Sequence, residues 1–178
     1  MIRLFVGLSL PEDVIRQLAL LGGGIPGARW MGEEQLHLTL RFIGEVDGPT
    51  FDDIRLALSA VQSPAFDLTL AGMGHFGDGR KLRALWARVA SAPLLTGLQE
   101  RVESVLVRAG VPAETRKFTP HVTLARLRDA PVGRVTNFLV AHGLFSAGPF
   151  RVDEFHLFSS HPSSGGSVYD VEESYALD

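Results

Sequence analysis

The sequence predicts a single-domain α+β protein over residues 1–178, made of two similar lobes of mainly antiparallel sheet, backed by helices, around a central groove. Three observations predict this fold. The length of 178 residues is close to that of one domain. A composition of 46% hydrophobic and 21% charged residues can bury a core and excludes a disordered chain. A similar order of elements also occurs twice along the chain.

The first half of the chain predicts alternating strands and helices. Proline at position 11, followed by two acidic residues, is typical of a helix start. Ile54, Leu58 and Val61 recur at helical spacing. The expected elements are a strand over 3–10, a helix over 11–21, a strand over 36–42, a helix over 47–61, and strands over 66–71 and 82–90 that a glycine-rich loop over 72–79 joins.

The second half repeats this order. Its strongest helix spans 93–109, with apolar residues at helical spacing and Gly110 as its stop; these are Leu94, Leu98, Val102, Val105 and Leu106. A strand over 121–127 and a helix over 132–142 follow, and the last two strands span roughly 150–159 and 167–175. Each half therefore reads helix, strand, helix and two strands.

The composition excludes several classes of function. There are no cysteines, so disulfide scaffolds, cysteine-zinc sites, iron–sulfur clusters and thiol nucleophiles are excluded. A protein that coats nucleic acid is strongly basic, whereas this chain has a net charge of −3. Any contact with nucleic acid is therefore expected to be local. No apolar stretch reaches the ~18 residues of a spanning helix, and Pro11 interrupts the N-terminal apolar run. We expect no membrane contact, a cytoplasmic location and a monomer.

One tetrapeptide pattern, His-apolar-Thr-apolar, occurs twice, at His37–Leu40 and at His121–Leu124. A shuffled chain of this composition would hold about 0.06 such tetrapeptides. The two copies are 121 − 37 = 84 residues apart, at equivalent places in the repeat. Because side chains alternate along a strand, each histidine shares a face with its threonine, while the apolar pair faces the other way.

The two motifs together predict acid–base chemistry at phosphorus. If the lobes are related by a pseudo-twofold axis, both histidines and both threonines converge on one groove. One imidazole can then act as a neutral base and the other as a protonated acid. The hydroxyls can donate to phosphate oxygens as charge develops in the transition state. No metal is required, and each motif offers one good zinc ligand where a site needs three or four.

The chain resembles the 2H phosphoesterase superfamily, and within it the bacterial and archaeal RNA 2',3'-cyclic phosphodiesterase branch, historically called 2'-5' RNA ligase. The resemblance spans nearly the whole chain. One departure is Gly77, where many relatives carry proline after the phenylalanine. The matching stretches are 3–8, Trp30, 37–45, 85–87 and 118–126, which include both motifs.

The resemblance implies a role for each motif residue. His37 would be the proton donor to the departing ribose oxygen, and His121 the proton acceptor that activates water. Thr39 and Thr123 would hold the phosphate. The implied substrates are RNA ends or tRNA fragments with a 2',3'-cyclic phosphate, and cyclic nucleotides. The implied product is a 2'-phosphomonoester, formed without a cofactor.

Four further residues are candidates for substrate binding. Arg41 follows the alternation of His37 and Thr39, so it is expected in the groove unless it is a solvated strand end. Arg126 is out of phase with its motif unless a bulge intervenes. Phe76 and Phe118 are candidates for stacking on a base, with an ordinary core role as the alternative.

Other local patterns are weaker evidence for a function. Basic residues such as Arg83, Arg116 and Lys117 can steer an RNA end despite the acidic total, or can form a solvated face. A structural role is favoured for His156, and surface positions are favoured for the histidines at 75, 142 and 161. The glycine clusters lack the Gly-Lys-Ser/Thr of a P-loop.

Two alternative functions stay open. The same site could join a cyclic-phosphate end to a 5'-hydroxyl, with RNA in place of water. A non-catalytic module could instead use the imidazoles only to recognise an RNA end or a nucleotide.

Overall fold

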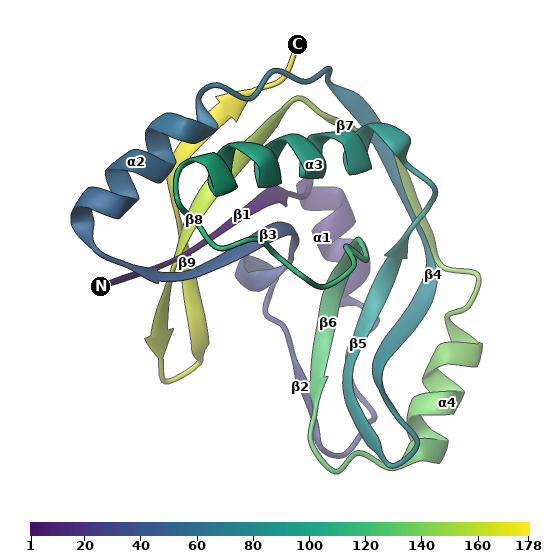
Figure 1. Ribbon diagram of the computed structural model, residues 1–178. Helices are drawn as coiled ribbons and strands as arrows, with labels where there is room; N and C mark the ends of the chain where they lie inside the picture. Colours follow the sequence, from purple (N-terminus) through teal and green to yellow (C-terminus); the bar gives the residue numbers. More distant parts are fainter.

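The computed structural model describes residues 1–178 and contains nine strands and four α-helices (Figure 1). The strands are β1 (Ile2–Ser9), β2 (Ala28–Trp30), β3 (His37–Val46), β4 (Phe66–Asp78), β5 (Lys81–Val89), β6 (His121–Leu127), β7 (Ser146–Val152), β8 (Glu154–Ser163) and β9 (Gly166–Ala176). The helices are α1 (Glu12–Ala19), α2 (Gly48–Leu58), α3 (Pro93–Arg108) and α4 (Val132–Ala141), and a 3-10 turn, η1, spans Glu33–Gln35. The predicted α+β class is confirmed.

The strands form two sheets in which every pairing is antiparallel. Sheet A has the order β3-β1-β8-β9 and sheet B the order β2-β6-β5-β4-β7. In Figure 1, sheet A lies to the left and the β4–β6 part of sheet B to the lower right. The two similar, helix-backed sheets that the sequence predicts are therefore present.

The two sheets do not correspond to the two halves of the chain. Helix α2 begins at Gly48 and α4 at Val132, which are 132 − 48 = 84 residues apart, as the motif histidines are. After α2 the chain crosses to sheet B, where β4 pairs with β5; after α4 and β7 it crosses back, and β8 pairs with β1. Each sheet thus takes strands from both halves, which binds the two repeats into one unit.

The predicted loop over 72–79 is wrong, because β4 continues as a strand to Asp78. Its glycines are accommodated by register shifts against β5, after Leu70 and after Phe76. Gly77 has a φ of 98°, and a Cβ there would meet the Lys81 carbonyl oxygen at 2.1 Å. A glycine-rich segment therefore marks an irregular strand that lies close to its neighbour.

The C-terminal region holds three strands where the sequence predicts two. β7 and β8 are separated by Asp153 alone, yet β7 pairs with β4 in sheet B and β8 with β1 in sheet A. The prediction of one strand over 150–159 joined the end of β7 to β8. One apolar run thus contains a change of sheet, which periodicity does not reveal.

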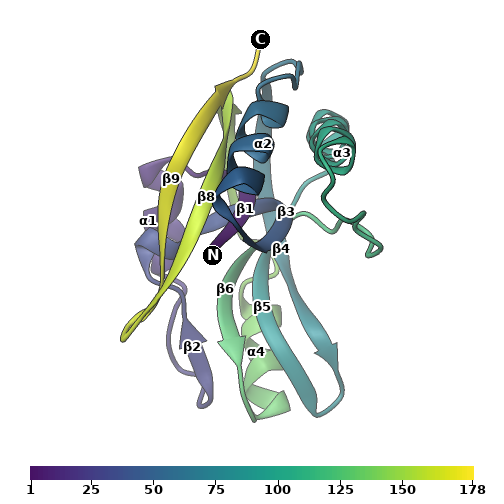
Figure 2. The same cartoon turned by 60° about the vertical axis from the view of Figure 1, so that its left-hand side comes forward.

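Helices α2 and α3 lie together on one face of sheet A, as Figure 2 shows from the side. Tyr175 Oη on β9 donates a hydrogen bond to the Arg55 carbonyl of α2 at 2.9 Å. The apolar stripe of α3 is fully buried and consists of Leu95, Leu98, Val102 and Leu106. Burying each large side chain contributes roughly 1.5–3 kcal/mol. Leu94, expected in that stripe, is instead 48% exposed, and Leu95 takes its place. None of the helices combines the length and the apolarity needed to cross a membrane.

Candidate active site

The structure brings the two motifs together in one cleft between the sheets. His37 is the first residue of β3, in sheet A, and His121 is the first residue of β6, in sheet B. Both histidines, both motif threonines and Arg126 line a cleft of ≈ 440 Å³. Residues far apart in the chain thus meet because each begins a strand at the same place in its repeat.

Each motif ends in a β-bulge at its second apolar residue. On β3, Thr39 pairs with Gly7 and Arg41 with Val6, which leaves Leu40 as the extra residue. On β6, Thr123 pairs with Trp86 and Ala125 with Leu85, which leaves Leu124 as the extra residue. The first six residues of both strands have the same burial pattern, and residues four and five of each are buried in succession. The bulge therefore reverses the alternation at the same place in both strands.

The bulges correct the prediction for Arg41. Its side chain turns away from the face that carries His37, and it is only 6% exposed. Its guanidinium donates to both carboxylate oxygens of Glu103 on α3, at 2.5 and 3.2 Å. Arg41 also lines a cavity of ≈ 480 Å³ that adjoins the cleft and that His121 and Thr39 border as well. Its charge is paired with Glu103, so its role in substrate binding stays a prediction.

For Arg126 the bulge acts in the opposite sense. A regular strand would turn this side chain away from His121 and Thr123, whereas the extra residue Leu124 restores the shared face. Arg126 is exposed and lines the cleft. It also lines two cavities that adjoin the cleft, of ≈ 280 and ≈ 480 Å³. The structure therefore places an unpaired cation in the same cleft as the two motif histidines.

Backbone carbonyls two residues before each histidine orient the rings. His37 Nδ1 lies 2.8 Å from the Gln35 carbonyl oxygen, and His121 Nδ1 lies 2.6 Å from that of Thr119. Because a carbonyl only accepts, Nδ1 is the protonated nitrogen in both rings. Each Nε2 is therefore the nitrogen that exchanges a proton in the cleft.

The two rings differ in their surroundings. His37 Nε2 lies 2.8 Å from Thr39 Oγ1, and the ring packs against Phe5, Phe158 and Tyr169 at centroid distances of 4.7, 6.1 and 5.1 Å. His121 Nε2 has no hydrogen-bond partner in the protein. One imidazole is thus enclosed by sheet A, and the other offers a free nitrogen.

The predicted aromatic candidates lie on the His121 side. Phe76 packs edge-on against the His121 ring at 4.8 Å and borders the cleft. Trp86 also packs against His121, at 5.6 Å. Phe118 lines a neighbouring cavity of ≈ 480 Å³ together with Phe42, Arg83 and Lys117. Phe76 therefore contacts a motif ring, whereas Phe118 lines an adjoining cavity that His121 also borders.

Both motif histidines are biased toward the neutral form. Burial lowers the pKa of His37, the Gln35 carbonyl opposes this, and the charges of His121 and Arg126 lower it further. Burial also lowers the pKa of His121, opposed by the Thr119 carbonyl, and Arg126 lowers it further. At neutral pH the free protein thus holds two neutral imidazoles beside the unpaired cation of Arg126.

The remaining histidines stay outside the cleft. His156 is buried, with Nδ1 2.8 Å from Ser174 Oγ, which confirms the structural role predicted for it. His75 is exposed, although it lies in β4, and His161 is exposed beside Asp170. The structure has no group of three or more His, Cys, Asp or Glu side chains that could hold a metal ion.

Sequence reasoning missed several residues of the cleft, among them Phe5, Gln35 and Tyr169. Gln35 has a recognisable signal, because it precedes His37 by two positions as Thr119 precedes His121. Phe5 and Tyr169 have none, since only the tertiary structure places β1 next to β3 and brings the Tyr169 ring of β9 against the His37 ring.

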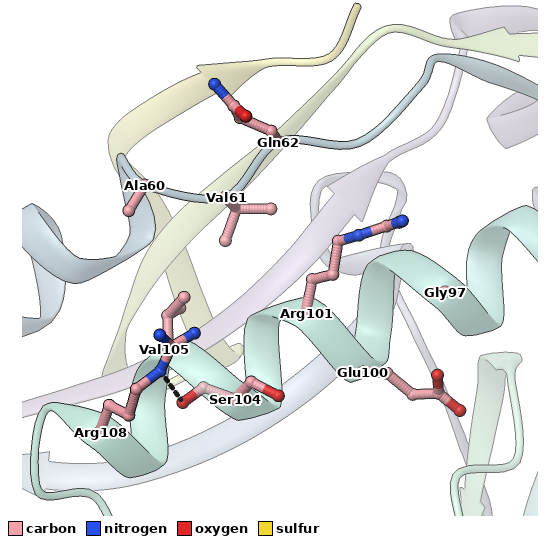
Figure 3. Close-up of a pocket in the computed structure, with 9 residues that line it drawn as sticks. All are labelled: Ala60, Val61, Gln62, Gly97, Glu100, Arg101, Ser104, Val105 and Arg108. Carbon is pink, nitrogen blue, oxygen red and sulfur yellow. Dashed lines mark hydrogen bonds between the residues drawn. The ribbon is translucent and has the colours of Figure 1, made fainter.

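A separate cavity of ≈ 500 Å³ lies between α3 and the segment that follows α2 (Figure 3). It is lined by Gln62, Arg101 and Arg108, among others, and Arg108 is bonded to the Ser104 carbonyl of its own helix at 3.4 Å. No residue of either motif borders it, so it is distinct from the cleft.

Comparison with known proteins gives a consistent result. A family model described as the 2'-5' RNA ligase superfamily matches residues 13–163. The RNA 2',3'-cyclic phosphodiesterase of Thermotoga maritima is 31% identical over 176 residues, which cover 95% of this chain and 92% of the relative. The protein of that name from Thermus thermophilus is 33% identical over 186 residues, with coverage of 98% and 90%.

Solved structures agree over the whole fold. The structure of E. coli LigT complexed with 3'-AMP superposes with a TM-score of 0.79 at 29% identity, covering 99% of this chain and 98% of that one. The structure of TT0787 of Thermus thermophilus gives a TM-score of 0.78 at 30% identity, with coverage of 98% and 97%.

Proposed function

The chain belongs to the 2'-5' RNA ligase superfamily, and from this premise we propose that it hydrolyses the 2',3'-cyclic phosphodiester of RNA ends or nucleotides to a 2'-phosphomonoester. The observation that carries the proposal is the convergence of His37 and His121, from two different sheets, on one cleft that also holds Arg126. The names of the curated relatives support the same substrate class.

His121 is proposed as the general base. Its Nδ1–H is held by the Thr119 carbonyl, and its Nε2 is free of protein partners. A pKa lowered by burial keeps Nε2 unprotonated at neutral pH. Nε2 takes a proton from water as the water oxygen forms a bond to phosphorus.

His37 is proposed as the general acid. As the bond from phosphorus to the 3'-oxygen breaks, protonated Nε2 gives its proton to that oxygen, and the product keeps the phosphate at the 2' position. The negative charge of a bound phosphodiester raises the pKa of a nearby imidazole, which opposes the lowering of the His37 pKa in the free protein. Substrate binding thereby favours the protonated form of His37, which is the form that acts as the acid.

Thr39, Thr123 and Arg126 are proposed to hold the phosphate. All three side chains border the cleft. Hydroxyl and guanidinium groups donate hydrogen bonds to the non-bridging oxygens, which carry the developing charge. Thr39 Oγ1 is also bonded to His37 Nε2, so substrate binding can exchange this contact for one to phosphate.

We propose that the reaction needs neither metal nor cofactor, because acid, base and charge stabilisation all come from side chains. The proposed partners are RNA ends with a cyclic phosphate. We propose a monomer, because residues of one chain line the whole cleft, and a cytoplasmic location.

The test is direct. Purified protein is incubated with 2',3'-cyclic nucleotides and with an oligonucleotide ending in a 2',3'-cyclic phosphate, with excess chelator present. We expect conversion to 2'-monophosphates, identified by 31P NMR. Full inhibition by the chelator, or binding without turnover, would contradict the proposal; binding alone would favour a recognition module.

Ligation is a second candidate, favoured by one observation. Beyond Arg126 and Tyr169 the cleft adjoins a further cavity of ≈ 280 Å³, which includes Arg29. A second RNA end placed there could present its 5'-hydroxyl instead of water. Adding a 5'-hydroxyl oligonucleotide to the same assay distinguishes the two reactions, because ligation yields a longer RNA.

A further inference from the structure

Arg41, which the bulge at Leu40 turns away from His37, is the buried member of a partly exposed network of hydrogen bonds. Arg41 Nε and Nη2 donate to the two carboxylate oxygens of Glu103, and Nη1 donates to the Phe42 carbonyl at 2.7 Å. Nη2 also donates to the Pro112 carbonyl, beyond the end of α3. One side chain thus connects β3 of sheet A to α3 and to the segment that follows it.

Glu103 extends the network along the same segment. Its Oε1 accepts a hydrogen bond from the Glu114 backbone N–H at 3.1 Å, and the Glu114 carboxylate accepts one from the Arg116 N–H at 3.0 Å. Hydrogen bonds from Arg41 hold the pKa of Glu103 below its ordinary value, so this carboxylate is charged at neutral pH. A charged acceptor strengthens both contacts.

The segment 112–120 depends on these contacts for its position. It contains no helix or strand and makes no backbone–backbone hydrogen bond. Its backbone anchors before Arg116 are the Pro112 carbonyl, held by Arg41, and the Glu114 N–H, held by Glu103. A segment that makes no backbone–backbone hydrogen bonds depends for its order on the side chains that bond to its backbone.

The same segment supplies groups to the site. Arg116 borders the cleft, and Lys117 and Phe118 line the adjoining cavity. Thr119 provides the carbonyl that holds His121 Nδ1. The strand that begins with His37 is therefore connected, through Arg41, to the segment that leads into His121.

We infer that Arg41 and Glu103 are a positioning pair, which holds the 112–120 segment against sheet A so that its side chains meet the substrate. This inference rests on the proposed function for the identity of the substrate. The two anchored groups, the Pro112 carbonyl and the Glu114 N–H, are closer in the chain to residues 116–118 than to Thr119. Thr119 lies next to β6, which helps to hold it in place. Loss of the pair should therefore weaken substrate binding more than turnover.

The test uses a double variant, because a single truncation leaves one charge buried and destabilises the fold. Arg41→Met/Glu103→Leu replaces both charges by apolar side chains of similar size, an exchange that is often neutral for stability. It nevertheless leaves the Pro112 carbonyl and the Glu114 N–H without partners. Glu100→Gln, an exposed change on the same helix, is the matched control.

We expect the double variant to keep a Tm near that of the wild type, while KM for a cyclic nucleotide rises about tenfold and kcat changes less than about threefold. Hydrogen exchange of the Glu114 and Arg116 amides should become faster, with β3 and α3 unchanged. A wild-type KM together with wild-type exchange of these amides would overturn the inference. The exchange readout needs no substrate, so a failure of the proposed function is recognised separately, as absence of turnover in the wild type.

Discussion

Phe42 and Arg126 occupy equivalent positions in the two motif strands, each five residues after its histidine and just beyond a bulge. Both side chains border the cleft. One strand thus contributes an aromatic surface and the other a cation, although the backbones repeat each other. This difference makes the cleft chemically asymmetric, which is compatible with the separate acid and base roles proposed for the two histidines.

Replacing either motif histidine should abolish most turnover. His37→Ala and His121→Ala are each expected to lower kcat at least ~10²-fold, the usual size of general acid–base catalysis. Steady-state hydrolysis of a cyclic nucleotide measures this effect. His75→Ala, at an exposed site on β4, is the control and should keep full activity. Undiminished kcat in either motif variant would refute the assigned chemistry.

The pH dependence follows from the two lowered pKa values. In the proposed mechanism the base, His121, must be neutral, so the rate rises as pH increases through its pKa. The proposed acid, His37, must be protonated, so the rate falls as pH increases through its pKa. Because both pKa values are lowered from 6.5 in the free protein, kcat/KM should be greatest below pH 6.5.

The kcat profile, which reports the bound complex, should lie at higher pH, because the phosphate charge raises the pKa of His37. Initial rates measured at low and at saturating substrate separate the two profiles. A range of about pH 4–9 suffices, because the ordinary pKa of histidine is about 6.5. A kcat/KM that climbs steadily into alkaline pH would be inconsistent with this pair.

Removing the charge of Arg126 should affect both binding and titration. Arg126→Gln eliminates a cation that lowers the pKa of both His37 and His121. We expect KM to rise about 10-fold and the kcat/KM profile to shift to higher pH. Arg151→Gln, in an exposed ion pair with Asp67 on sheet B, is the control. Identical pH profiles for the wild type and Arg126→Gln would contradict the role of this charge.

Gly74 lets the Trp86 ring lie against β4, and Trp86 in turn packs against His121. A Cβ at position 74 would meet Trp86 Cη2 at 2.3 Å, so Gly74→Ala must displace the ring. We expect a loss of about 1–3 kcal/mol in the free energy of unfolding, and lower activity. Urea denaturation monitored by tryptophan fluorescence measures the first effect.

Gly133→Ala provides the matched control, since nothing lies within 4 Å of a Cβ at that position. Its stability should equal or slightly exceed that of the wild type, because alanine favours a helix. Equal stability of Gly74→Ala and Gly133→Ala would show that Trp86 tolerates the added methyl group.

The sequence alone determined the α+β class, most element positions and the two motifs. These follow from local physics: apolar spacing distinguishes helix from strand, and alternation sets the apolar residues of each motif toward the core. Leu38 and Val122 are both fully buried, as that alternation predicts. The 84-residue repeat was likewise readable, because it preserves residue type at fixed separation.

Tertiary structure decided which charge enters the cleft. The alternation rule favoured Arg41 over Arg126, and the bulges at Leu40 and Leu124 reversed that order. A bulge depends on how a strand pairs with its neighbour, and those neighbours, β1 and β5, lie about 30 or more residues away in the chain. The exchange of strands between the sheets has the same origin, since long-range pairing, rather than local preference, selects the partner of each strand.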